Sequence, residues 1–309
     1  MSDLTEVTVF WLIGLVGSTS GVVLNLVLLF VLLKRWPKYA FSFLFATTAC
    51  FDLFFAVTEI FTQHQIAVKN GVMFVLSAHS IEWLLRPYYL VMMLVLCVHF
   101  FGCMHQLLIL AALYQYHFEY VRKRFRTPDK IILFRNLAIS CTGGLIIAIA
   151  ATIGIDEAME RGRKHYIDMF DDEYFQANAK NFLYAADIRD GATMLFFGLD
   201  LLFVTISIAA TAYYAFRARL SSIDNEDEWT RNANDPHANK IPFARSQFTR
   251  ILSARTIITW VVLIPLLMVV TALIFRLNIE LLGGGVMAPW SFIPALNAAT
   301  TLFVLRNND

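Results

Sequence analysis

The stretch GVVLNLVLLFVLLKRWPK, residues 21–38, is apolar except for Asn25 until it ends in a basic turn. An α-helix needs about 20 mostly apolar residues to cross the hydrocarbon core of a bilayer. Lys and Arg collect on the cytoplasmic side of such helices. The stretch therefore predicts the inner part of a membrane span that carries one polar side chain.

The composition of the chain extends this prediction to the whole protein. Of its 309 residues, 58% are hydrophobic and 16% are charged. Soluble domains have about 45–50% apolar and about 25% charged residues, so a lipid bilayer is the expected surrounding. The net charge of +1 provides only a weak field, and we expect no nucleic-acid partner.

Stretches of span length recur along the chain and predict an all-α membrane protein, a single seven-transmembrane helix bundle over residues 1–309. The segment 71–85, GVMFVLSAHSIEWLL, is shorter, carries His79 and Glu82, and is predicted to be an interfacial or loop segment. The first residues lack the basic region of a cleaved signal peptide, so the first span is expected to be retained. The predicted spans are about 8–33, 39–62, 88–118, 131–154, 191–216, 255–276 and 286–305.

Charge alternates between the loops that join these spans. Basic residues follow spans 1, 3 and 5, whereas acidic residues collect after span 4. The positive-inside rule then predicts an outside N-terminus, a cytoplasmic C-terminus, and a third cytoplasmic loop over the polar segment 217–250. The basic residues are Lys34, Arg35 and Lys38 after span 1, Arg122, Lys123, Arg124, Arg126 and Lys130 after span 3, and Arg217, Arg219, Arg245, Arg250 and Arg255 after span 5.

Three polar side chains fall inside spans 1, 2 and 7, which are neighbours in a sequential ring of seven helices. They are Asn25, Asp52 and Asn297, each near the middle or in the inner half of its span. Buried polar groups need hydrogen-bond partners, so these residues are predicted to form an intramembrane network. Two roles stay open: a static knot between helices, or a two-state switch with or without a bound cation.

Span 3 carries a second polar face. His99, Cys103 and Gln106 follow i, i+4, i+7 spacing and therefore share one side of a helix. Asp200 lies near the middle of span 5 and is expected opposite that face. The face is either a set of satisfied interior polar groups or one wall of a ligand pocket.

Pro265 and Pro294 lie inside spans 6 and 7. Each removes one helical hydrogen bond and kinks its helix, as a static bend or as a moving hinge. The sequence has no HExxH or GxSxG motif, so we expect no metal site, no cofactor and no enzymatic activity. The cysteines stand in apolar runs and are predicted to be small buried side chains. They are Cys50, Cys97, Cys103 and Cys141.

Three segments resemble the nematode serpentine chemoreceptors of the Str, Srd and Srh kind. The stretch at 21–38 resembles their first span, with an Asn, an aliphatic run and a basic turn. LLILAALYQYHFEYVRK, residues 107–123, resembles the end of their third span, which is commonly His-Phe-x-Tyr-Arg-Tyr. PALNAATTLFVLR, residues 294–306, resembles their last span, with a Pro, an Asn and a closing Arg.

The resemblance implies a G-protein-coupled receptor of the plasma membrane, including that of sensory cilia, in which an external odorant or metabolite activates a heterotrimeric G protein. The small molecule would bind between the outer halves of spans 3, 5, 6 and 7. Val121 stands where the family has an arginine, and Arg122 follows it. The implied ligand-binding residues are His99, Cys103, Gln106, Asp200 and Trp290. The implied coupling residues are Tyr120, Arg122, Lys123, Arg124, Arg126, Arg245 and Arg250.

Two other classes of protein stay open at this point. A seven-span ion channel or transporter would place Asp52 and Asp200 on a conduction path. A receptor-like membrane protein without signalling would fit the displaced arginine. Ion flux without a G protein would identify the first class, and ligand-stimulated nucleotide exchange would exclude the second.

Overall fold

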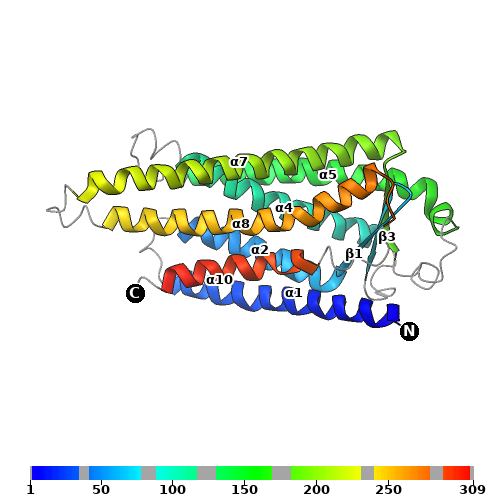
Figure 1. Ribbon diagram of the computed structural model, residues 1–309, viewed down its shortest axis with the longest axis horizontal. Coiled ribbons are helices and arrows are strands. Elements are labelled where there is room, and N and C mark those ends of the chain that lie inside the picture. Colours follow the sequence, from blue (N-terminus) through cyan, green and yellow to red (C-terminus); the bar gives the residue numbers. More distant parts are fainter. Residues whose placement is uncertain are drawn as a thin grey trace.

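Long helices run side by side over the seven predicted spans (Figure 1). The computed structural model describes residues 2–34, 42–77, 88–116, 130–168, 182–230, 240–278 and 288–306. The helices are α1 (Ser2–Lys34), α2 (Ser42–Thr62), α4 (Tyr88–Tyr116), α5 (Lys130–Asp168), α7 (Gly191–Thr230), α8 (Lys240–Ile274) and α10 (Ile293–Arg306). Each predicted span thus coincides with a helix over most of its length.

The bundle is apolar on its outer surface. Phe30, Phe134 and Phe303 are 67%, 70% and 65% exposed, although large side chains of this kind are normally buried in a protein that water surrounds. Lipid tails are the surrounding in which such a surface is stable. Seven membrane crossings and their sidedness stay predictions. The described helical stretches long and apolar enough to cross a membrane are Val9–Lys34, Phe43–Thr62 and Phe134–Ile153.

Several helices extend beyond the apolar stretch that predicted them. α7 continues to Thr230 and α8 begins at Lys240, so most of the predicted loop 217–250 is helical. α5 likewise continues to Asp168, well past the predicted end of span 4. The added turns contain good helix formers such as Arg, Leu, Glu and Ala. The ends of the helices were predicted from hydropathy, which shows where a helix leaves an apolar environment and not where the helix itself ends.

A small antiparallel sheet lies across one end of the bundle, so the prediction of an all-α protein is wrong in this respect (Figure 1). Its strands β1 (His64–Lys69), β2 (Val72–Ser77) and β3 (Phe182–Asp187) are ordered β1-β2-β3. β2 covers the start of the segment 71–85, so that segment is not a span over its described part. The N-terminus lies at the same end of the bundle. We call this end the sheet end and the opposite end the C-terminal end.

The two-residue turn between β1 and β2 explains why the chain reverses here. Asn70 and Gly71 have φ of 52° and 81°, the left-handed values that a type I′ hairpin turn requires and that Asn-Gly adopts readily. β3 arrives from the connection between α5 and α7 and pairs with β2. Two connections that are distant in the sequence therefore form one layer.

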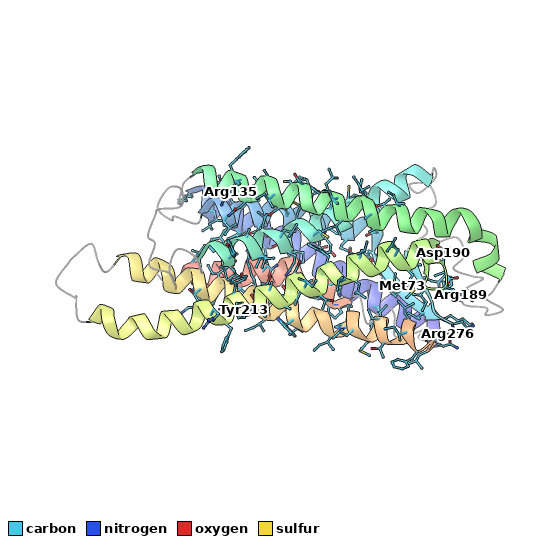
Figure 2. The ribbon with its side chains drawn as sticks, turned by 90° about the horizontal axis from the view of Figure 1, so that it is seen from above. Met73, Arg135, Arg189, Asp190, Tyr213 and Arg276 are labelled. Atoms are coloured by element: carbon cyan, nitrogen blue, oxygen red, sulfur yellow. The ribbon has the colours of Figure 1, made fainter. Side chains whose placement is uncertain are left out.

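The end of α8 is attached to this layer. α8 ends in a Schellman turn, in which Leu277 N donates to Ala272 O at 2.8 Å and Arg276 has a φ of 55°. Beyond the turn, Asn70 N donates to Asn278 Oδ1 at 3.2 Å. Figure 2 shows Met73, Arg189 and Arg276 together at the sheet end, whereas Tyr213 lies toward the other end.

Helix α1 approaches α10 very closely. A methyl group on Gly21 would lie 3.0 Å from Pro294 Cβ and 3.2 Å from Ala56 Cβ, so a side chain there would push the helices apart. Gly144 likewise permits a close contact between α5 and α4, because a methyl group there would lie 3.1 Å from Met104 Cγ. Small residues at helix interfaces permit the close packing on which membrane bundles depend.

The cysteines differ from one another in burial, so the prediction that all are buried is wrong. Cys103 is buried, Cys97 and Cys141 are half-buried, and Cys50 is exposed. A bilayer explains the exposed thiol, since lipid accepts a weakly polar side chain as readily as the protein interior does. None of these four residues forms a disulfide in the described part of the chain.

Candidate functional site

A fully buried arginine forms the centre of the polar interior. Arg255 lies well inside α8 and is 1% exposed. Its Nη1 donates to Thr48 Oγ1 on α2 at 2.8 Å, and its Nη2 donates to Thr301 Oγ1 on α10 at 3.1 Å. The guanidinium carbon lies 5.7 Å from the centroid of the Phe45 ring, which is within cation–π range. One side chain thus connects three helices.

The two threonine hydroxyls are held so that their oxygens accept from Arg255. Thr48 Oγ1 donates to Phe45 O at 3.1 Å, and Thr301 Oγ1 donates to Asn297 O at 2.7 Å. Each hydroxyl has a single hydrogen, and that hydrogen is used on its own helix. The remaining lone pairs therefore face the guanidinium as acceptors.

A buried carboxylate supplies charge of the opposite sign. Asp52 is 3% exposed and interacts favourably with the charge of Arg255. Asn297 Nδ2 donates to Asp52 Oδ2 at 3.4 Å. An isolated charge in a low-dielectric interior is very unfavourable, so the acid and the arginine make each other's burial possible.

Asn25 joins the same interior through the backbone of α10. Its Nδ2 donates to Gly21 O at 2.8 Å and to Pro294 O at 3.1 Å. The predicted trio is therefore brought into one region: Asp52 and Asn297 are hydrogen-bonded, and Asn25 reaches α10 just beside them. We call these residues together the Arg255 network. It consists of Asn25, Thr48, Asp52, Arg255, Asn297 and Thr301.

Sequence reasoning missed the centre of this network. It assigned Arg255 to the third cytoplasmic loop as a charge that sets topology, and that assignment is wrong because the residue is buried inside α8. A hydropathy pattern does not distinguish an arginine at the edge of the membrane from an arginine that faces the interior of the bundle. The signal that could have found it is Asp52, since a buried acid needs a counter-charge.

The predicted face of α4 is also buried. Cys103 and Gln106 are 5% and 8% exposed. Gln106 Nε2 donates to Thr211 Oγ1 on α7 at 3.1 Å, and that hydroxyl donates to Ser207 O at 2.7 Å. Gln106 is thus a satisfied polar contact between α4 and α7.

No described hydrogen bond joins the other predicted ligand residues to this contact. Asp200 precedes Thr211 by eleven residues on α7, about 16 Å along the helix, and its position opposite the face of α4 stays a prediction. The side chains of Asp200 and His99 lie outside the described part of the structure. Trp290 is half-buried just before α10, and its buried Nε1 has no hydrogen-bond partner among the described residues.

A second polar cluster at the end of α2 was not predicted. Glu59 and Thr62 of α2, Gln63 after it and Gln65 of β1 are all buried. Gln63 has a φ of 39°, its N donates to Glu59 O at 2.9 Å, and its buried Oε1 has no partner among the described residues. A strained residue with an unsatisfied buried acceptor is a frequent mark of a functional site. The polar run TQHQ directly after an apolar span was the available signal.

Two of the predicted coupling residues, Arg245 and Arg250, stand on the part of α8 toward the C-terminal end (Figure 1). Arg250 is exposed on α8, and the side chain of Arg245 on the same helix lies outside the described part. The second-loop residues Tyr120, Arg122, Lys123, Arg124 and Arg126 also fall outside the described residues.

The two prolines differ in their positions. α8 continues through Pro265. Pro294 instead stands in the first turn of α10, directly after a break at Phe292, where a missing N–H costs little. The predicted kink in the last span is therefore a helix break, and hinge motion at either proline stays a prediction.

Fold and site together define a class of protein: an integral membrane bundle with a lipid-facing apolar surface, a sheet at one end and a charged polar interior. The family model for the serpentine type 7TM GPCR chemoreceptor Str matches residues 11–307. The chain belongs to this family, as the resemblance of its spans predicted. No curated protein matches it.

Proposed function

We propose that the protein is a chemosensory receptor that couples to a heterotrimeric G protein. An external small molecule binds one conformation of the bundle better than another and so shifts the equilibrium between them. The shifted conformation promotes nucleotide exchange on the G protein at the plasma membrane. The observation that carries this proposal is membership of the Str chemoreceptor family over residues 11–307.

The ligand is proposed to bind toward the sheet end, beneath the strands. Gln63 Oε1, a buried acceptor directly before β1, supports this position, since it has no partner among the described residues. Trp290 Nε1, a buried donor before α10, also has no partner among them. Leaving such a group unsatisfied costs about 1–3 kcal/mol. A small molecule that donates to Gln63 Oε1 or accepts from Trp290 Nε1 would recover that cost. His99, Cys103 and Asp200 on α4 and α7 remain proposed lining residues.

The G protein is proposed to dock at the C-terminal end. The support is the basic sequence from Arg122 to Arg126 together with Arg245 and the exposed Arg250. Positive charge on this face would attract an acidic partner surface and speed its association. Tyr120 stands beside this cluster, in the place of the family's third-span motif.

The channel or transporter alternative receives no support from the Arg255 network. Asp52 is engaged by Asn297 and faces the charge of Arg255, so a conducted cation would have to compete with a cation that is part of the chain. We therefore propose a single function.

The proposal is tested with the purified receptor in lipid nanodiscs together with a heterotrimeric G protein. A panel of volatile ketones, alcohols, amines and carboxylic acids is screened for an increase in nucleotide exchange. We expect at least one chemical class to raise the rate in a saturable way. Ligand-dependent ion flux in vesicles without a G protein, with no effect on exchange, would contradict the proposal.

A further inference from the structure

We propose that the C-terminal end of the bundle has a binding site for the headgroup of an anionic phospholipid, at the seam between α4 and α7. Arg217 contacts the phosphate of the lipid, and the tyrosines Tyr114 and Tyr213 hold the arginine and the headgroup at the same depth. The site goes beyond the proposed receptor function, and it is measurable without any odorant or G protein.

A row of tyrosines crosses the seam between α4 and α7. The ring centroids of Tyr114 on α4 and Tyr214 on α7 lie 5.6 Å apart, and those of Tyr214 and Tyr213 lie 5.4 Å apart, both edge to face. Tyr114 and Tyr213 are 52% and 53% exposed. A tyrosine combines an apolar ring with a polar hydroxyl, and such side chains collect where the membrane meets water. The row therefore marks the depth of the lipid headgroups.

Arg217 adds a positive charge at the end of this row. Its guanidinium carbon lies 5.9 Å from the centroid of the Tyr213 ring, which stands one turn earlier on α7 and is within cation–π range. The contact with the ring face restrains the side chain and uses none of its N–H donors. Arginine presents these donors in a planar fork that matches the oxygens of a phosphate.

The charge of Arg217 has no carboxylate partner in the described part of the chain. Arg189 at the sheet end differs, because its Nε and Nη2 donate to the two oxygens of Asp187 at 2.8 and 2.7 Å. The acids of α7 beyond Arg217 begin at Asp224, about 10 Å further along the helix. An exposed arginine without an acidic neighbour is available to an anion from outside the chain.

The membrane supplies such an anion at this depth. Residues 201–216 of α7 carry no charge, and Arg217 is the first charged residue after them, so it stands at the boundary between hydrocarbon and headgroups. The basic loops predict that this end faces the cytoplasm, and the cytoplasmic leaflet carries the anionic phospholipids. A lipid is favoured over a free phosphate, because its chains cover apolar side chains such as Phe216, which is 62% exposed.

The direct test measures which headgroup binds beside Arg217. An aromatic, fluorescent non-natural amino acid replaces Phe216 in the full chain, which is reconstituted in nanodiscs. Phosphatidylserine and phosphatidylcholine with brominated chains quench this fluorophore when they bind next to it. We expect phosphatidylserine to bind about fivefold more strongly, the weight of one basic residue near an anionic membrane surface. R217Q should remove this preference.

Two further kinds of variant locate the effect. R135Q is the matched control, because Arg135 is exposed at the same end on α5 and lies across the bundle from Tyr213 (Figure 2). It removes the same charge and should leave the quenching at position 216 unchanged. Y213L removes the ring beneath the guanidinium and should lower the preference roughly twofold, whereas Y213F keeps the ring and should retain the preference.

Each outcome supports or overturns the lipid site. Loss of the preference in R217Q and its reduction in Y213L, with R135Q unchanged, support a site at the row of tyrosines. An equal loss in R135Q would show a general attraction of this end for anionic lipid and would overturn the site, as would equal quenching by the two lipids in the unsubstituted sequence. Full competition by glycerophosphoserine, the headgroup without its chains, would assign the site to a soluble phosphate and overturn the lipid. The ligand screen judges the receptor function separately from all of these results.

Discussion

The Arg255 network and the polar residues Gln63 and Trp290 differ in the hydrogen bonds that their side chains make between helices. Each side chain of the Arg255 network makes at least one hydrogen bond, and the bonds join α1, α2, α8 and α10. Asn25 Oδ1 and Arg255 Nε of the network are buried without partners among the described residues, and so are Gln63 Oε1 after α2 and Trp290 Nε1 before α10. The side chains of the network nevertheless join helices through their other atoms, whereas those of Gln63 and Trp290 make no such bond within the described part of the chain, which is why we propose them as ligand contacts.

This contrast fits the two tasks of a receptor. A ligand site gains affinity from polar groups that are buried and unsatisfied before binding. A conformational equilibrium, by contrast, depends on contacts between helices that exist in one state and not in the other. The following substitutions are arranged from the largest expected effect to the smallest.

Removing the negative charge of the Arg255 network should lower the stability of the bundle more than any other substitution proposed here. Asp52→Leu leaves Arg255 as a buried cation without its carboxylate, and breaking a buried pair in this way costs about 3–5 kcal/mol. The measurement is thermal unfolding in nanodiscs. The double variant D52L/R255M should recover most of the loss, because no lone charge remains. A double variant as unstable as D52L would show that the two charges do not compensate each other.

Overpacking the close contact of α1 with α10 should cause the next largest loss of stability. Gly21→Ala places a methyl group 3.0 Å from Pro294 Cβ and should destabilise the bundle by about 1–3 kcal/mol through overpacking. Gly14→Ala is the matched control, because no atom lies within 4 Å of a methyl group there. Equal melting temperatures for the two variants would mean that α1 does not pack on α10 as described.

The basic cluster should affect coupling and not ligand recognition. Replacing Arg122, Lys123 and Arg124 with Gln should slow G-protein association roughly tenfold, because like charges on one face steer an acidic partner. Nucleotide exchange is measured at several salt concentrations, with surface expression and ligand binding as controls. Unchanged exchange would show that these charges only set the orientation of the chain in the membrane.

Substitutions of the two buried glutamines should change the stability of the bundle least. One substitution should lower the stability and the other should raise it. Gln106→Leu removes a satisfied bond to Thr211 and should destabilise the bundle by about 1 kcal/mol. Gln63→Leu removes an unsatisfied buried acceptor, so it should stabilise the bundle by up to about 1 kcal/mol and weaken the ligand response. Destabilisation by both changes would show that Gln63 already has a partner.

Much of the fold was predictable because membrane helices obey local rules. A helix must satisfy its own backbone groups in lipid, so each apolar stretch of span length specifies a helix without reference to the rest of the chain. The sheet was not predicted, although Asn70–Gly71 is a strong hairpin signal. Its third strand comes from the connection before α7, and pairing between such distant segments leaves no local pattern.

The candidate site was predictable only in part. Asn25, Asp52 and Asn297 were recognisable because a polar side chain in a long apolar run has few explanations other than a bundle interior. Arg255 was not recognisable from the sequence, because it stands at the edge of an apolar run there. Only the folded bundle shows that its side chain is in the interior. The bond of Gln106 to Thr211 was not predictable for a similar reason, since the relative register of α4 and α7 is a property of their packing. The pairing of Asp200 with the face of α4 stays a prediction.

The sequence by itself determined that the chain enters a bilayer as helices, which side chains are too polar to face lipid, and which family it belongs to. These are consequences of local transfer free energies and short motifs. The tertiary structure alone decided which polar groups meet: that Arg255 lies between Thr48 and Thr301, and that Gln106 bonds to Thr211. Partner choice depends on how helices cross and on their relative depth, and no single stretch of sequence carries that information.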